Sequence, residues 1–348
     1  MHYYSSYAYR YVRTHLKNCL PHPKTISAWY TSINGSPGIN IEALKCIKEK
    51  AALVDYPLFA CITFDEMAIR KNIEFDGSKY YGYVDFGFNN TTNCAEPAKE
   101  VLVFLLVCLN QNWKIPIAYF LINKMNAEQK RNIVLQCISA VHNVGMRVVS
   151  ITCDGMSTNL SVLKLLGCDF NDITSLQTWF LHPETKEKIF VFLDPCHMLK
   201  LVRNVIGDLK NIVNRDDQFI RWSDLVNLHE LQQQENMHLA NKLRSAHIHY
   251  HNQKMKVRFA VQIFSTSVAN ALLFCKNTLK LKEFQSCQST IEFLQVFNDL
   301  FDILNSKNMK QSGFKQPLNE QNKEIITNKL EEIKLHIIFE DNQWRAFN

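Results

Sequence analysis

The 348-residue sequence has no long hydrophobic run, no C-x-x-C pair and only ten glycines. Without a run of about eighteen apolar residues we expect no membrane span, and the first residues lack the charged and apolar regions of a signal peptide. None of the glycines belongs to a G-x-x-x-x-G-K-[ST] motif, which excludes a Walker-type phosphate-binding loop. The eleven cysteines are an odd, scattered set, which favours free, mostly buried thiols in a reducing compartment.

Composition bounds the size of the core and the class of partner. A chain of this length with 47% hydrophobic residues can bury more than one core, and its length suggests about two or three domains. The formal net charge is +6 and the isoelectric point about 8.6. This mildly basic balance permits a nucleic-acid partner but does not establish one, because many ordinary soluble proteins have similar values.

Hydrophobic periodicity divides the chain into three segments. Residues 1–55 are polar and helical, residues 56–195 alternate strands with helices, and residues 196–348 are almost entirely helical. The strands predicted in the middle segment are Leu58–Phe64, Lys79–Phe86 (after a turn at Phe75–Ser78), Glu100–Leu109, Arg147–Cys153 and Ile189–Leu193. Helices are predicted at 127–144, 157–166, 222–234, 259–273, 290–304 and 322–339. The predicted fold class is α/β, a mixed sheet flanked by helices and followed by a mainly α-helical domain.

Three of the predicted strands end directly in an aspartate. Asp65 follows the first strand, Asp154 follows Arg147–Cys153, and Asp194 follows the last. Carboxylates delivered from neighbouring strand ends can share divalent metal ions and so support phosphoryl transfer. The alternative is that each aspartate only caps a turn or the next helix. Asp65 and Asp154 are the favoured metal ligands.

Other acids and histidines rank lower. Glu66 points to the opposite face of its strand from Asp65 because side chains alternate along a strand, and Asp85 is a further candidate acid on the second strand. His247, His249 and His251 alternate, but no cysteine or acid stands nearby at ligand spacing. They therefore indicate a surface or partly buried strand rather than a zinc site.

As a set, several stretches resemble the P-element family of DNA transposases, including the THAP-domain proteins derived from it. They occur in family order along nearly the whole chain. The stretches are Leu20-Pro-His-Pro-Lys-Thr-Ile, Asn34-Gly-Ser-Pro-Gly, Phe64-Asp-Glu-Met-Ala-Ile-Arg-Lys, Tyr81-Gly-Tyr-Val-Asp-Phe-Gly, Thr152-Cys-Asp-Gly, Asp194-Pro-Cys-His-Met-Leu-Lys-Leu-Val-Arg-Asn, Leu239-Ala-Asn-Lys-Leu, Gln253-Lys-Met-Lys-Val, Ser265-Thr-Ser-Val-Ala and Asn298-Asp-Leu-Phe-Asp-Ile-Leu-Asn-Ser.

The resemblance implies an RNase H-like catalytic domain interrupted by a helical GTP-binding insertion. Residues 1–55 would form a helical segment for DNA contact or oligomerisation, 56–195 the first part of the RNase H-like domain, and 196–348 the insertion. Asp65 and Asp154 match the first two catalytic acids, which bind Mg²⁺ or Mn²⁺. By similarity, the nucleotide pocket is lined by Lys242, Val257, Asn298 and Asp302.

The same resemblance implies the partners. GTP would serve as a cofactor for assembly with DNA, and the DNA partners would be transposon ends and target. A homo-oligomer in the nucleus, without a membrane partner, is expected. Asn298 and Asp302 are four residues apart and would share one helix face, where the carboxylate can accept from a guanine edge. The alternative is an exposed face of a core helix.

Two family features have no match. The third catalytic acid follows the insertion in a D-H-L-E-type stretch, which does not occur before Asn348, and Glu340 stands in no matching context. The zinc-binding THAP module is also absent. We therefore expect a chain truncated at both ends and inactive alone, as a fragment, a degenerate copy or an erroneous gene model. The alternative function is a domesticated, non-catalytic DNA- or GTP-binding or regulatory protein.

Overall fold

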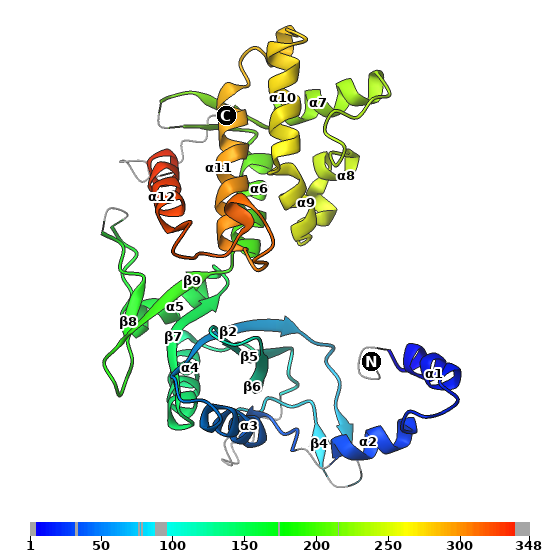
Figure 1. Cartoon of the computed structure of the whole chain (residues 1–348), viewed down its shortest axis with the longest axis vertical. Helices are drawn as coiled ribbons and strands as arrows, with labels where there is room; N and C mark the ends of the chain where they lie inside the picture. Colours follow the sequence, from blue (N-terminus) through cyan, green and yellow to red (C-terminus); the bar gives the residue numbers. More distant parts are fainter. Residues whose placement is uncertain are drawn as a thin grey trace. The chain divides into compact units, whose positions relative to one another are not determined.

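The computed structural model describes residues 5–31, 34–75, 77, 79–87, 96–172, 175–214 and 216–337. Glu340 and part of the predicted Phe75–Ser78 turn lie outside the described residues. The chain divides into two compact units, Met1–Phe192 and Leu193–Asn348, which we call the sheet unit and the helical unit (Figure 1).

The sheet unit contains a mixed seven-stranded sheet in the order β1-β6-β5-β2-β7-β9-β8. The central strand β2 runs antiparallel to β5 and parallel to β7. The strands are β1 Gly38–Ile39, β2 Leu58–Ala68, β5 Glu100–Cys108, β6 Lys114–Ile122, β7 Met146–Cys153, β8 Trp179–Leu181 and β9 Lys188–Leu193, with a separate ribbon of β3 Glu74–Phe75 and β4 Tyr80–Tyr81. The helices are α1 Ser6–His15, α2 Pro23–Thr31, α3 Ile41–Ala52, α4 Ala127–Asn143 and α5 Ser157–Leu166. The predicted α/β class is confirmed.

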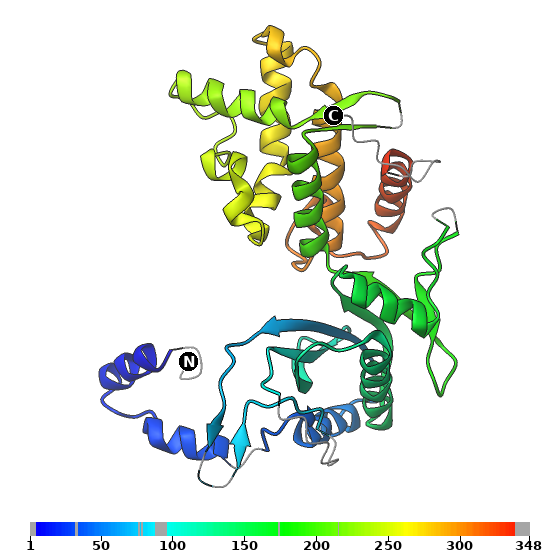
Figure 2. The same cartoon turned by 180° about the vertical axis from the view of Figure 1, so that it is seen from behind.

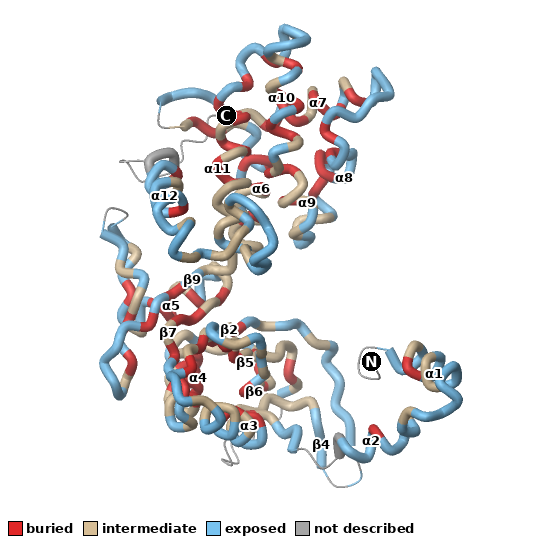
Figure 3. Tube along the Cα trace, in the orientation of Figure 1, coloured by how far each residue is buried: buried red, intermediate tan, exposed pale blue. Residues whose placement is uncertain are grey.

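One face of the sheet is buried and the other is only partly covered. Alternate residues of β2 from Leu58 to Phe64 are buried, whereas those between them are half-buried, and β5 repeats this alternation. Helix α3 contacts strand β6, helix α4 contacts strand β7, and α4 also packs on α5. Figure 3 shows buried positions gathered along these strands and α4. By alternation, Glu66 belongs to the buried face and Asp65 to the other.

The helical unit packs helices around its own apolar core (Figure 2). This core includes Leu228, Ile263, Leu272 and Leu294, all at most 1% exposed. The elements are α6 Pro195–Leu209, β10 Asn211–Val213, β11 Phe219–Arg221, α7 Trp222–Gln234, α8 Ser245–Ile248, η2 Tyr250–Gln253, α9 Val257–Ile263, α10 Thr266–Asn277, η3 Lys282–Phe284, α11 Gln288–Leu304, η4 Gly313–Lys315 and α12 Lys323–Ile337.

The stretch Val257–Asn277 is long and apolar enough to cross a membrane by composition. The chain breaks there into α9 and α10 at Phe264 and Ser265, so the single helix predicted at 259–273 is wrong. Val268 and Leu272 of α10 are fully buried in the core of the helical unit. The apolar composition is thus that of core helices.

The second predicted strand, Lys79–Phe86, is mostly wrong. Only Tyr80–Tyr81 forms strand β4, which pairs with β3 rather than with the main sheet. Gly82 follows with a φ of +102°, and a Cβ at this position would lie 2.0 Å from the carbonyl oxygen of Asn72. This close approach and positive φ require glycine and end the strand. Asp85 then forms an isolated bridge with Leu121 of β6.

Strands β6 and β8 were not predicted from the sequence. Strand β6 contains Pro116, which cannot donate to a ladder and argues against a central strand. The register shifts between Phe104 and Leu105 of β5, so that Pro116 pairs opposite Leu105 and Ala118 opposite Phe104. This bulge accommodates the proline, and Ile117 and Ala118 are consecutively buried beside it.

The predicted strand at His247, His249 and His251 is also wrong. His247 lies in α8, His251 lies in η2, and His249 is the turn residue between these two short helical elements. The Nδ1 atom of His247 accepts the Arg244 backbone N–H at 3.0 Å, and its Nε2 lies 2.9 Å from Oε1 of Gln262. His247 is therefore a buried structural residue. The alternation of histidines predicted a strand where the chain forms a helical turn.

Candidate metal centre and nucleotide site

The parallel register of β2 and β7 brings Asp65 and Asp154 to neighbouring positions. The last paired residues of β2 and β7 are Thr63 and Thr152, and each aspartate stands two residues further along the chain. Side chains two apart share a face, and Cys61 Sγ lies 3.4 Å from Thr152 Oγ1 on that face. Strand β2 continues to Ala68, so Asp65 lies within this strand, opposite Val103 of β5, and not at the strand end that the sequence predicted. Asp154 directly follows the last residue of β7, the strand beside β2.

The two carboxylates have different surroundings. Asp65 is exposed, and its Oδ1 accepts the Glu66 backbone N–H at 2.9 Å. Asp154 is half-buried, and its Oδ1 accepts the Met156 N–H at 3.0 Å and the Asn159 amide Nδ2–H at 2.7 Å. The first residues of α5 and the turn before it therefore hold one oxygen of Asp154.

A buried lysine lies beneath this pair and was missed by the sequence analysis. Lys130 of α4 is 3% exposed, donates to Glu66 Oε1, and donates to Asn159 Oδ1 at 2.8 Å. Burial lowers the pKa of the Lys130 ammonium, whereas the charges of Asp154 and Asp65 oppose that shift. The sequence signal was present: Lys130 occupies the apolar stripe of α4 with Ile133, Val134 and Cys137.

The donor set of Asp65 and Asp154 fits a hard divalent cation. Mg²⁺ is usually bound by one or two carboxylates together with waters and substrate phosphates, so two aspartates are chemically suitable ligands for it. Among the residues that the structure describes, no group of three His, Cys, Asp or Glu side chains is arranged to hold a metal. A third protein ligand is thus absent from the described part of the chain.

The remaining strand-end and strand acids do not join the pair. Asp194 caps α6, because its carboxylate accepts the N–H groups of Cys196 and His197 at 3.0 and 3.2 Å. For this residue the capping alternative is correct. Asp85 pairs with β6, which is separated from β2 by β5, so Asp85 is wrong as an extra acid. Glu66 contacts Lys130 on the other face.

The predicted nucleotide residues fall at three places in the helical unit. Asn298 and Asp302 share one face of α11, with Asn298 Nδ2 3.4 Å from Asp302 Oδ2. Burial raises the pKa of Asp302, while Lys315, 3.8 Å away, opposes this. Lys242 is exposed between α7 and α8, and Val257 begins α9 half-buried. Within the described residues, no hydrogen bond or ion pair joins Lys242 to Asn298 or Asp302.

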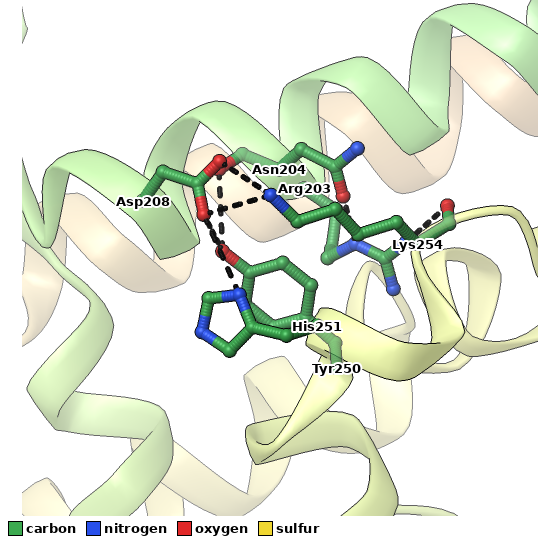
Figure 4. Close-up of polar contacts among 6 residues, drawn as sticks. All are labelled: Arg203, Asn204, Asp208, Tyr250, His251 and Lys254. Atoms are coloured by element: carbon green, nitrogen blue, oxygen red, sulfur yellow. Dashed lines mark hydrogen bonds and ion pairs between the residues drawn. The ribbon is translucent and has the colours of Figure 1, made fainter.

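A polar cluster on α6 and η2 was also missed by the sequence analysis (Figure 4). The Tyr250 hydroxyl donates to Asp208 Oδ1 at 2.6 Å, and Lys254 Nζ donates to Asp208 Oδ2 at 3.0 Å. The fully buried Arg203 donates to the Lys254 carbonyl at 2.8 Å and lies 4.8 Å from the centre of the Tyr250 ring. These contacts fix the segment that precedes α9.

Three family models match the chain. The "TNP-like, RNase H N-terminal domain" matches residues 35–167, and the "TNP-like, GTP-binding insertion domain" matches residues 196–317. The "Transposable element P transposase-like, HTH domain" matches residues 1–29. A solved structure, the Drosophila P element transposase strand transfer complex, superposes with a TM-score of 0.73 at 24% identity. It covers 99% of this chain and 73% of the solved chain, and it shows the same fold.

Two curated relatives agree with these models. The chain is 31% identical over 95% of its length to the DNA transposase THAP9 of Homo sapiens. It is 27% identical over 83% of its length to the Transposable element P transposase of Drosophila melanogaster. It spans only 36% and 35% of the length of these relatives. The chain belongs to the P-element transposase family and contains the family's GTP-binding insertion domain.

Proposed function

We propose that this chain supplies part of a DNA transposase that cleaves and joins phosphodiester bonds with Asp65 and Asp154 as ligands of Mg²⁺ or Mn²⁺. The neighbouring position of the two aspartates, two residues beyond the Thr63–Thr152 pair, supports this most directly. A bound divalent cation would activate an attacking water or 3′-hydroxyl and offset charge on the phosphate. Asn159 and the Met156 N–H keep Asp154 oriented. With genomic DNA as substrate, the activity belongs in the nucleus.

The proposed active site needs one more donor. Because no three metal-binding side chains come together among the described residues, a third acid must come from elsewhere before the site is complete. We therefore expect the chain alone to be inactive or very weakly active. The alternative is a non-catalytic DNA- or GTP-binding derivative, or a regulatory protein that pairs with a complete transposase.

Mn²⁺ binding and DNA nicking test the metal site. Wild-type chain, Asp65→Ala, Asp154→Ala and the control Asp169→Ala, an exposed acid on another loop, are titrated with Mn²⁺ and incubated with duplex DNA. Either active-site substitution should weaken Mn²⁺ binding at least tenfold, because one of two carboxylate ligands is removed. Nicking should be weak and should disappear in both variants.

Two results decide against this assignment. Robust nicking that survives both substitutions would show that other residues carry the reaction. A wild-type chain that binds duplex DNA but neither binds Mn²⁺ nor nicks DNA would favour the non-catalytic alternative.

We also propose that GTP binds the helical unit at Asp302, Asn298, Lys242 and Val257 as an assembly cofactor. The carboxylate of Asp302 can accept from the N–H donors of guanine. Asp302→Ala should weaken GTP binding at least tenfold, since a hydrogen bond to a charged group contributes about 1.5–3 kcal/mol. Glu292→Ala is the control, because Glu292 lies on the same helix and accepts a hydrogen bond from Gln288 at 2.8 Å.

Calorimetry with GTP and ATP measures this effect. The loss should be specific to GTP, because adenine lacks the guanine donors. Equal GTP affinity for wild type and Asp302→Ala would discard the pocket without affecting the metal site.

A further inference from the structure

A charged side chain is buried next to residues that adjoin the two aspartates. Lys130 is 3% exposed and contacts Glu66 on the buried face of the sheet, whereas Asp65 lies on the other face of β2. Burying an ammonium is costly unless it is paired and hydrogen-bonded. Lys130 donates hydrogen bonds to Glu66 and Asn159, and both residues adjoin the acid pair.

Lys130 fixes the orientation of the Asn159 amide. An ammonium is only a donor, so the amide oxygen of Asn159 must face it, at 2.8 Å. The amide nitrogen then faces the other way and donates to Asp154 Oδ1 at 2.7 Å. Asn159 is fully buried, which leaves it no solvent to satisfy a reversed amide. The lysine thus determines that Asp154 meets a donor and not an acceptor.

Lys130 also connects the two strands that carry the aspartates. It contacts Glu66, the residue next to Asp65 on β2, and through Asn159 it reaches Asp154 at the end of β7. The second oxygen of Glu66, Oε2, is buried and has no hydrogen-bond partner. The contact with Lys130 therefore holds Glu66 in an otherwise unfavourable site, and with it the β2 segment that presents Asp65.

We infer that Lys130, acting through Asn159 and Glu66, is a positioning residue that sets the relative placement of Asp65 and Asp154 for a divalent cation. This inference rests on the proposed metal site. Residues that hold metal ligands without touching the metal typically change affinity by about 10–100-fold when they are removed. Lys130 holds such a position: it contacts Glu66, the chain neighbour of Asp65, and Asn159, which donates to Asp154.

Mn²⁺ titration of the full chain, with the electron paramagnetic resonance spectrum of the bound ion, tests the inference. Lys130→Met keeps the length of the side chain but removes charge and donors. It should weaken Mn²⁺ binding by about tenfold or more and change the spectrum of the ion that still binds. Lys130→Arg, which keeps the positive charge and the hydrogen-bond donors, should partly restore both the Mn²⁺ affinity and the wild-type spectrum. Lys164→Met, at an exposed lysine of α5, should match wild type.

A second variant separates positioning from folding. Asn159→Ala keeps the Lys130–Glu66 pair but breaks the connection to Asp154, so it should also weaken Mn²⁺ binding even if Lys130→Met does not fold. If a folded Lys130→Met or Asn159→Ala chain keeps wild-type Mn²⁺ affinity and spectrum while Asp65→Ala loses Mn²⁺ binding, the positioning role of Lys130 is wrong and the metal site stands. Absence of Mn²⁺ binding by wild type, or equal binding by Asp65→Ala, would overturn the metal site and this inference together.

Discussion

Asp208 shows how single side chains tie segments of the helical unit together. The hydrogen bond from the Tyr250 hydroxyl lowers the pKa of the Asp208 carboxyl, burial opposes this, and Lys254 and His251 lower it further. Burial raises the pKa of Tyr250 above its ordinary value, and the hydrogen bond to Asp208 raises it further. The ionised form of Asp208 is therefore the one that the folded chain stabilises.

This shift predicts a pH dependence of stability. Because the folded-state pKa of Asp208 lies below its unfolded value of about 3.9, its stabilising contribution is complete above that pH. It is lost as the pH falls through the folded-state pKa. Asp208→Asn should therefore reduce the drop in unfolding free energy between about pH 5 and pH 3. Urea unfolding at several pH values measures it, with Asp216→Asn, at an exposed acid, as control. An unchanged pH profile in Asp208→Asn would contradict the prediction.

At the scale of elements, the close approach of the Tyr250 side chain to the backbone of α6 at Gly207 decides how α6 packs on η2. A Cβ at Gly207 would lie 2.4 Å from the ring and hydroxyl of Tyr250 in η2. Gly207 and Tyr250 are both buried, and Tyr250 is held by its hydrogen bond to Asp208. The absence of a side chain on this turn of α6 is what lets the tyrosine lie against the helix.

Gly207→Ala should therefore destabilise the chain. Replacing a helical glycine with alanine gains about 1 kcal/mol, but overpacking a well-packed site costs about 1–3 kcal/mol. Since Tyr250 is fully buried, we expect the overpacking to dominate, measured by urea unfolding. In a Tyr250→Leu background the same substitution should be neutral or stabilising. Destabilisation that is equal in both backgrounds would show that Tyr250 is not the cause.

At the scale of the whole molecule, each unit has its own core. Ile62, Phe104 and Ile151 are fully buried in the sheet unit, and Leu272 and Leu294 are fully buried in the helical unit. We propose that the domain boundary lies near residue 196 and that the two cores unfold separately. The division into Met1–Phe192 and Leu193–Asn348 supports this proposal.

Calorimetry should accordingly resolve two unfolding transitions. Ile62→Ala should lower the midpoint of one and Leu272→Ala the midpoint of the other, each by removing about 2–5 kcal/mol of core packing. A single transition that both substitutions shift equally would show that the chain unfolds as one cooperative unit.

Much of the fold was predictable where local patterns were strong. Strand β7 and helix α5 formed where predicted, because an apolar β-branched run and a helical repeat are local properties. Strand β6 escaped prediction because Pro116 is tolerated only at a bulge in the pairing with β5. The helical turn at His247 is held in part by its contact with Gln262, fifteen residues away, which the alternation of histidines does not reveal.

The sequence by itself determined many of the local elements, the family resemblance and the choice of Asp65 and Asp154 as candidate ligands, because each is encoded within a few residues. Only the tertiary structure decided which acids are neighbours. Register places Asp65 and Asp154 two residues beyond the paired Thr63 and Thr152, and the strand order leaves Asp85 on the far side of β5. The fold also makes Asp194 a helix cap. It also buries Lys130 beneath the pair. Strand pairing and helix packing join residues far apart in the chain, and no local pattern specifies such contacts.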